Sequence, residues 1–234
     1  MDFDGKTVLI TGASGNLGRA VAQAFAGHGA NRVLIDRSAQ HLAQAFGAET
    51  NEQMLAVADL LDQAQVSAMV SKAVERFKRL DVLCNIAGGF RMGEPVHATS
   101  DATWQAMFDL NARTLLNAAR AVVPRLLEAG GGAIVNVGAF AAQKGAAQMG
   151  AYTASKSVVI RLTEAMASEL REKKINVNCV LPTVIDTPEN RAAMPGADPA
   201  RWVAPHDLAN VIVFLASPAA RAIHGAALPV TGLS

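Results

Sequence analysis

The chain has 234 residues, of which 51% are hydrophobic and 18% are charged, proportions that are typical of a globular protein and exclude a disordered or fibrous one. The 21 basic and 20 acidic residues nearly cancel, and no basic run forms the stripe that a nucleic-acid partner needs. Because no apolar run approaches the roughly 18 residues of a membrane span and no secretion signal is evident, we expect no membrane partner and a cytoplasmic location.

Short β-branched runs alternate with longer segments of helical period along the chain. The predicted strands are Thr7–Thr11, Arg32–Asp36, Leu55–Ala58, Asp81–Ile86, Ala133–Val137, Ile175–Leu181 and Ala227–Val230. The predicted helices are Leu17–His28, Asp62–Phe77, Asp101–Glu128, Tyr152–Glu172 and His206–Ala216. This alternation predicts one α/β domain over residues 1–234, a Rossmann-type doubly wound parallel sheet of about seven strands with helices on both faces.

A glycine-rich turn joins the first predicted strand to the first predicted helix. Its expected cofactor-binding residues are Gly12, Ser14, Gly15, Asn16, Leu17 and Gly18. Glycine leaves no Cβ in the way, so the pyrophosphate of a dinucleotide can approach the backbone N–H groups at the positive end of the helix dipole. A glycine-rich turn without a ligand is the alternative interpretation.

Asp36 closes the second predicted strand, near the spacing of about 20 residues at which a carboxylate binds the adenosine ribose. A carboxylate there repels a 2′-phosphate, so we predict NAD as the cofactor. The adjacent Arg37 leaves NADP possible. A solvated or helix-capping aspartate is the alternative.

Tyr152 and Lys156 lie four residues apart on a predicted helix and therefore share one face. A phenol with a pKa near 10 is a poor proton donor or base at neutral pH, and a neighbouring cation lowers that pKa by favouring the phenolate. The pair is thus a candidate for catalytic proton transfer. The alternative is a solvated surface pair.

The glycine turn, the strand end from Asn85 to Gly88 and the Tyr152–Lys156 helix occur in this order, and in this combination the chain resembles the short-chain dehydrogenase/reductase family over nearly its whole length. The resemblance implies that Tyr152 transfers the proton, that Lys156 binds the nicotinamide ribose and that Asn111 belongs to the proton relay. The further cofactor-binding positions that it implies are Asp59, Leu60, Asn85, Ala87, Gly88, Tyr152, Lys156, Pro182, Ile185 and Thr187. Asp59 and Asn85 have a turn or capping role as their alternative.

Two departures from the family pattern bear on the substrate. The middle glycine of the turn stands at Gly15 rather than at position 16, and the family's catalytic serine is Ala139 here. Dihydropteridine reductases, one group within the family, share these departures, and the segment from Leu181 to Arg191 is similar to theirs. This likeness implies NADH-dependent reduction of a quinonoid dihydropteridine or a similar conjugated acceptor, with the loops at about 88–99 and 183–204 bordering this small-molecule substrate.

Two other functions stay open at this point. One is an ordinary carbonyl reductase, such as a 3-oxoacyl-carrier-protein reductase, which the missing serine disfavours. The other is a catalytically silent dinucleotide-binding sensor or scaffold. In this family the helices around Asn111 and Tyr152 form subunit interfaces, which implies a homodimer or homotetramer. The histidines and cysteines never fall at metal-ligand spacing, so we predict no metal site.

Overall fold

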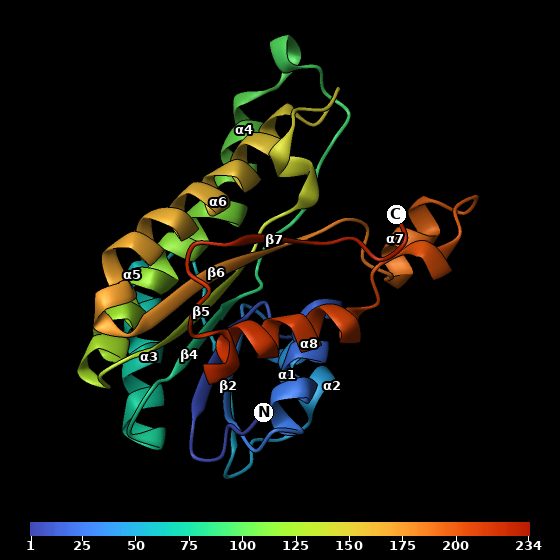
Figure 1. The fold of residues 1–234 in the computed structure, drawn as a ribbon. Coiled ribbons are helices and arrows are strands. Elements are labelled where there is room, and N and C mark those ends of the chain that lie inside the picture. Colours follow the sequence, from blue (N-terminus) through green and yellow to red (C-terminus); the bar gives the residue numbers. More distant parts are fainter.

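Seven short runs of mostly β-branched residues pair into a single parallel sheet in the computed structural model, which describes residues 1–234 (Figure 1). The strands are β1 (Thr7–Thr11), β2 (Asn31–Asp36), β3 (Gln53–Val57), β4 (Val82–Asn85), β5 (Gly132–Val137), β6 (Ile175–Pro182) and β7 (Ala227–Val230). Their order in the sheet is β3-β2-β1-β4-β5-β6-β7. The predicted doubly wound fold is confirmed, and all seven predicted strands are present.

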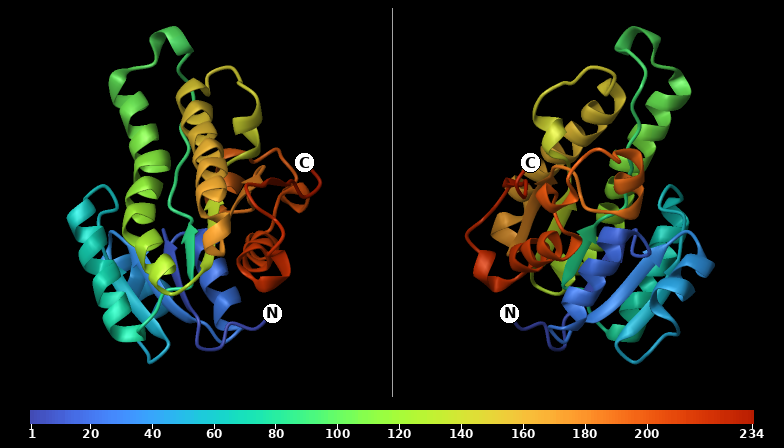
Figure 2. Two further views of the ribbon diagram at one scale, coloured as in Figure 1. Left: turned by 60° about the vertical axis from the view of Figure 1, so that its left-hand side comes forward. Right: turned by 90° about the vertical axis from the view of Figure 1, so that its right-hand side faces the viewer.

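The helices cover both faces of the sheet (Figures 1 and 2). One face packs against α1 (Asn16–Ala26), α2 (Ala39–Phe46) and α8 (Pro205–Ala216), and the other against α3 (Gln63–Phe77), α5 (Thr114–Glu128) and α6 (Gly150–Leu170). Beyond the sheet, α4 (Asp101–Phe108) lies beside α6, and α7 (Pro188–Ala193) follows β6. None of these helices is long and apolar enough to cross a membrane.

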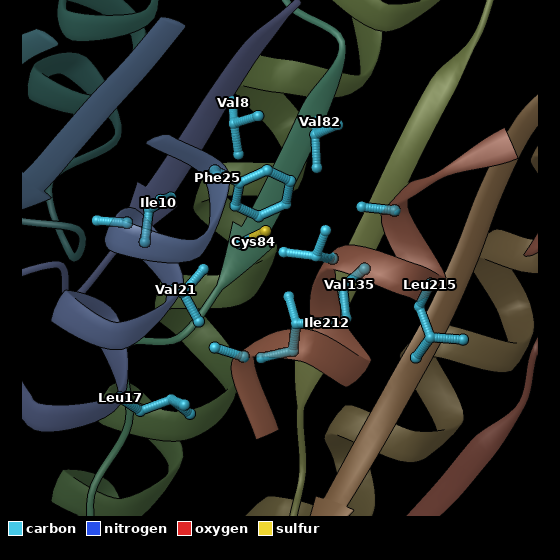
Figure 3. Packing of buried hydrophobic residues seen from close by; sticks show 14 of the residues in the cluster. Val8, Ile10, Leu17, Val21, Phe25, Val82, Cys84, Val135, Ile212 and Leu215 are labelled. Carbon is cyan, nitrogen blue, oxygen red and sulfur yellow. The ribbon is translucent and has the colours of Figure 1, made fainter. Parts of the chain in front are cut away.

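Strand residues alternate between two apolar cores because successive side chains point to opposite faces of a sheet. Val8 and Ile10 of β1 join Phe25 and Ile212 in the core beneath α1 and α8 (Figure 3), whereas Leu9 joins the core beneath α3 and α5. All five residues of β1 are buried, as expected for a central strand of a parallel sheet covered on both faces.

The strand order reverses at β1, which pairs with β2 on one side and with β4 on the other. Parallel strands all end at the same edge, and the crevice at such a reversal is where open α/β sheets bind ligands. The turn after β1 and the segment after β4 therefore meet at the carboxyl edge of the sheet. The fold thus brings the predicted cofactor turn to the expected place.

The structure differs from the prediction mainly in its helices. The segments that contain α2 and α7 had no predicted helix. The predicted helix Asp101–Glu128 consists of α4 and α5 joined by a π-helical turn at Asp109–Arg113. Such a turn inserts an extra residue per turn and rotates the following side chains, which hydrophobic spacing does not reveal.

A buried polar contact ties β4 and β5 to α6. Asn85 and Asn136 are register partners on the two strands, and the Asn85 Nδ2 donates to Asn136 Oδ1 at 2.8 Å. Asn136 Nδ2 in turn donates to the Thr163 hydroxyl of α6 at 2.8 Å. All three side chains are buried, so these hydrogen bonds satisfy polar groups that water cannot reach.

We predict that Asn136→Ala lowers the free energy of unfolding by about 1–3 kcal/mol, because it leaves the Asn85 amide buried without an acceptor. Urea unfolding followed by circular dichroism measures this change. The matched control is Asn51→Ala at an exposed turn, which should change the stability by less than about 0.5 kcal/mol. Equal stabilities of the two variants would contradict a structural role for the buried amides.

Candidate active site

Two close backbone approaches fix the glycine-rich turn between β1 and α1. Gly12 has a φ of +63°, and a Cβ at this residue would lie 2.9 Å from the Cα of Ala87 after β4. A Cβ on Gly18 would lie 2.2 Å from the carbonyl oxygen of Gly12. Both positions require glycine, because a larger residue would push apart the turn, α1 and the end of β4.

This turn leaves the N-terminus of α1 open. Gly15 is the N-cap residue and offers no side-chain hydrogen bond, and the first helical turn contains no acidic residue. The helix begins with Asn16, Leu17 and Gly18, and the first N–H groups of an α-helix have no acceptor within the helix. Unsatisfied N–H groups at the positive end of a helix dipole suit a phosphate, so this turn fits the pyrophosphate of a dinucleotide.

Asp36 lies beside this turn at the end of β2. One carboxylate oxygen accepts a hydrogen bond from Ser14 Oγ at 2.5 Å, and the other accepts from the backbone N–H of Ser38 at 3.1 Å. Ser14 was predicted as a cofactor contact, and in this structure its side chain orients Asp36. Arg37 follows and is exposed. The carboxylate is therefore held in a defined orientation at the edge where a ribose would lie.

Asp59 and Leu60 follow β3 at the same edge. The Asp59 carboxylate accepts from the N–H of Leu61 at 2.9 Å, which is the turn role left open by the sequence. Leu60 is buried, and its carbonyl accepts from Asn117 Nδ2 at 2.9 Å. The structure thus brings both residues to the predicted edge and gives each a structural contact there.

The segment after β4 has a buried part and a part that lies against Lys156 and Asn111. Asn85 commits its amide to Asn136, so it supports the strand end from within the sheet. The N–H of Ala87 donates to the Thr11 hydroxyl at 3.1 Å. A Cβ on Gly88 would lie 2.9 Å from Lys156 Nζ and 3.0 Å from Asn111 Oδ1. Gly88 therefore brings the strand end into contact with two of the three predicted catalytic residues.

Asn111 lies in the π-helical turn between α4 and α5 and is only 2% exposed. Its Oδ1 accepts from the N–H of Gly89 at 2.9 Å, and its Nδ2 donates to the Gly89 carbonyl at 3.1 Å and to Ser155 Oγ at 3.0 Å. The side chain thus ties the segment after β4 to α6. Its expected place in a proton relay remains a prediction.

Tyr152 and Lys156 lie in the first two turns of α6. Lys156 is buried, and its Nζ donates to the Val137 carbonyl of β5 at 2.9 Å. Burial lowers the pKa of Lys156 to about 8, since a charged ammonium is costly away from water. Burial also raises the pKa of Tyr152 to about 12.

The expectation that Lys156 lowers the pKa of Tyr152 is therefore wrong for the protein by itself. The ammonium is directed to the Val137 carbonyl, and desolvation of the phenol raises its pKa. Tyr152 consequently keeps its proton at neutral pH. A protonated phenol is able to donate to a substrate atom.

Hydroxyl groups near this pair all have other partners. Thr153 donates to the Met149 carbonyl at 2.9 Å, Ser155 to the Tyr152 carbonyl at 2.8 Å and Ser157 to the Ala142 carbonyl at 2.8 Å. Ala139 follows β5 and is 4% exposed, with no hydroxyl to offer. Tyr152 is thus the one hydroxyl group of the first two turns of α6 for which the structure records no hydrogen bond to a backbone carbonyl.

The segment after β6 carries the last three predicted contacts. Pro182 ends β6 at the carboxyl edge, Ile185 forms a bridge with Val203, and Thr187 is the N-cap of α7. In the first turn of α7, Glu189 accepts from Asn16 Nδ2 of the glycine turn at 2.8 Å. The predicted substrate loop and the predicted cofactor turn therefore touch.

Sequence reasoning missed two contacts at this site. Phe90 lies edge-to-face against Tyr152, with ring centroids 4.8 Å apart and an angle of 84° between the planes. The Val137 carbonyl, which accepts from Lys156, was also not anticipated. No motif marks either one, although Phe90 lies inside a loop that was expected to border the substrate.

Comparison with known proteins identifies the family. Residues 6–197 match the short chain dehydrogenase family. D-threitol dehydrogenase of Mycolicibacterium smegmatis is 34% identical over 98% of this chain and 93% of its own. The chain belongs to the short-chain dehydrogenase/reductase family, whose members are NAD(P)-dependent oxidoreductases.

Solved structures agree with this assignment. Carveol dehydrogenase from Mycobacterium avium, in complex with NAD, has a TM-score of 0.89 and 29% identity, covering 98% of this chain and 97% of that one. The 3-ketoacyl-(acyl-carrier-protein) reductase from Brucella melitensis, complexed with NADH, has a TM-score of 0.87 and 30% identity, covering 98% of both chains. The three relatives carry the names of three different substrates, so these likenesses leave the substrate of this protein open.

Tyr152 is the only tyrosine of the chain, so the absorbance of tyrosinate reports on this one phenol. We predict that the phenol stays protonated well above its unperturbed pKa of about 10, up to pH values near 12 or to the loss of the fold. Absorbance and circular dichroism measured together during an alkaline titration test this. Tyrosinate with a midpoint at or below pH 10 in a natively folded protein would contradict burial as the dominant influence.

Proposed function

We propose that the protein reduces a planar, conjugated acceptor with NADH, and that the acceptor is a quinonoid dihydropteridine or a compound of similar chemistry. The observation that carries this proposal is the combination of Tyr152 and Lys156 with an alanine at position 139. The proton donor is retained, and the second hydroxyl donor of the family is missing. The resemblance noted for the Leu181–Arg191 segment implies the same acceptor, whereas the relatives reported above carry the names of other substrates.

The missing donor matters because hydride addition to a ketone builds negative charge on oxygen. Removing one hydrogen-bond donor to such a charge typically costs on the order of 100- to 1000-fold in rate. Thr153, Ser155 and Ser157 do not replace it, since each already donates to a carbonyl. A conjugated acceptor spreads the developing charge over its ring system and depends less on a donor from the protein.

The chain's own residues supply the proton and the orientation. When bound, NADH supplies the hydride. Tyr152 carries its proton at neutral pH and donates it to the acceptor atom that becomes basic as hydride arrives. Lys156 lies one helical turn further along α6 and would hold the ribose hydroxyls of the cofactor. Asn111 holds the Gly89 segment against α6, which carries both groups.

The cofactor assignment rests on Asp36. Its oriented carboxylate suits two ribose hydroxyls and repels a 2′-phosphate at the same place. Two relatives of known structure contain NAD or NADH, which supports the same choice. The homodimer or homotetramer remains a prediction.

We predict that NADH binds more tightly than NADPH. Asp36→Asn should bring the dissociation constants of the two cofactors closer together, because the variant removes the charge that repels the 2′-phosphate. Isothermal titration calorimetry with both cofactors measures the ratio of dissociation constants. Arg37→Gln serves as the neighbouring control and should weaken NADPH alone. A wild-type preference for NADPH would show that Arg37 outweighs Asp36 and would refute the assignment.

A second prediction separates activated acceptors from simple ketones. Ala139→Ser adds a donor that is worth about 2.7–4 kcal/mol when it is well placed, so ketone reduction should rise 100-fold or more from a low baseline. Reduction of quinonoid dihydropteridine should change far less, and the added oxygen at this buried position should make it slightly slower. The measurement is kcat/KM for both acceptors, with Tyr152→Phe as the variant that lacks the proton donor.

Each alternative has its own outcome in this experiment. A wild-type protein that reduces simple ketones or 3-oxoacyl thioesters as fast as the conjugated acceptor is an ordinary carbonyl reductase. A protein that binds NADH but does not oxidise it, whichever acceptor is supplied, is a dinucleotide-binding sensor or scaffold. Either result would overturn the proposal.

A further inference from the structure

Phe90 is the aromatic side chain in contact with the proton donor. Its ring lies edge-to-face on Tyr152, with a centroid distance of 4.8 Å, yet 57% of the residue is exposed. More than half of this apolar residue thus remains open beside the phenol. An apolar ring held in this way offers a contact surface to whatever receives the proton.

The backbone that presents Phe90 is fixed on both sides. The preceding peptide, Gly89, exchanges two hydrogen bonds with the buried amide of Asn111, at 2.9 and 3.1 Å. Further along the same loop, the N–H of Gly93 donates to the Gln148 carbonyl at 2.9 Å, in the loop that precedes α6. The ring is therefore anchored at both ends of its segment to the region that carries Tyr152.

Few phenylalanines of this chain are exposed. Of the eight phenylalanines, the two that are exposed are Phe90 and Phe140, and Phe140 directly follows Ala139. Scattered exposed apolar residues are ordinary on a protein surface. Phe90 differs from such residues because its ring contacts the proton donor, a position that suits a flat apolar ligand.

We propose that Phe90 determines acceptor specificity by packing its open ring surface against the planar ring of the acceptor. This inference rests on the proposed function and names the residue that selects planar acceptors over small aliphatic ones. An aromatic pair contributes a free energy that corresponds to roughly a two- to tenfold change in binding. Small aliphatic ketones have no such surface and gain little from the ring.

The test compares Phe90→Leu and Phe90→Trp with wild type, using quinonoid dihydropteridine and a small aliphatic ketone as acceptors. Phe90→Leu should raise KM for the planar acceptor roughly two- to tenfold and leave kcat nearly unchanged. Phe90→Trp should leave that KM at the wild-type value or lower it. For the aliphatic ketone, kcat/KM should stay within about twofold in both variants.

The matched control is Phe77→Leu, which removes a partly buried phenylalanine at the far end of α3. It should leave both acceptors unaffected. If Phe90→Leu and Phe77→Leu raise KM for the planar acceptor equally, the proposal is overturned. A fall in kcat for both acceptors would also overturn it, because Phe90 would then act only by positioning Tyr152.

Binding of the oxidised ring compound pterin to the protein–NAD complex, measured by calorimetry, gives a readout that needs no turnover. If quinonoid dihydropteridine is not reduced but pterin binds and Phe90→Leu weakens it two- to tenfold, the proposed function fails and the role of Phe90 stands. If the acceptor is reduced and Phe90→Leu changes neither its KM nor pterin binding, only the role of Phe90 fails. Absence of pterin binding in wild type overturns the role of Phe90 as well.

Discussion

The Asn111 amide is the contact on which the geometry of the site depends. It exchanges two hydrogen bonds with the Gly89 peptide and donates a third to Ser155, which joins the segment after β4 to α6. The π-helical turn around Asn111 presents this amide to both partners at once. Without it, buried polar groups would lose their partners, and Gly88 would no longer lie against Lys156.

Burial, rather than attraction between neighbours, sets the charge state of the candidate catalytic pair. The pKa of Lys156 falls to about 8 and the pKa of Tyr152 rises to about 12, so desolvation moves both groups toward their neutral forms. At neutral pH Lys156 still carries its proton for most of the time, and Tyr152 is uncharged. The protein therefore keeps a protonated phenol ready, and the electrostatics of transfer depend on what binds beside it.

Much of the fold and of the site could be predicted from local pattern. Strand positions follow from β-branched runs, and the glycine turn follows from conformational need at Gly12 and Gly18. Helices α2 and α7 have only eight and six residues, too few for a clear helical period. The π-helical turn, the pKa of Tyr152 and the position of Phe90 depend on tertiary contacts that no spacing in the sequence encodes.

The pairing of β1 with β4 has a consequence for synthesis of the chain. Thr7 at the start of β1 bonds through its N–H to the Asp81 carboxylate 74 residues later, and Lys156 and β6 follow only after that. Such non-local contacts form slowly. In a growing chain, α1 and α3 precede β4, but α5 and α8, which complete the two cores, emerge from the ribosome later. Part of the apolar surface of β1 and β4 is therefore exposed during that interval, when the chain is vulnerable to aggregation.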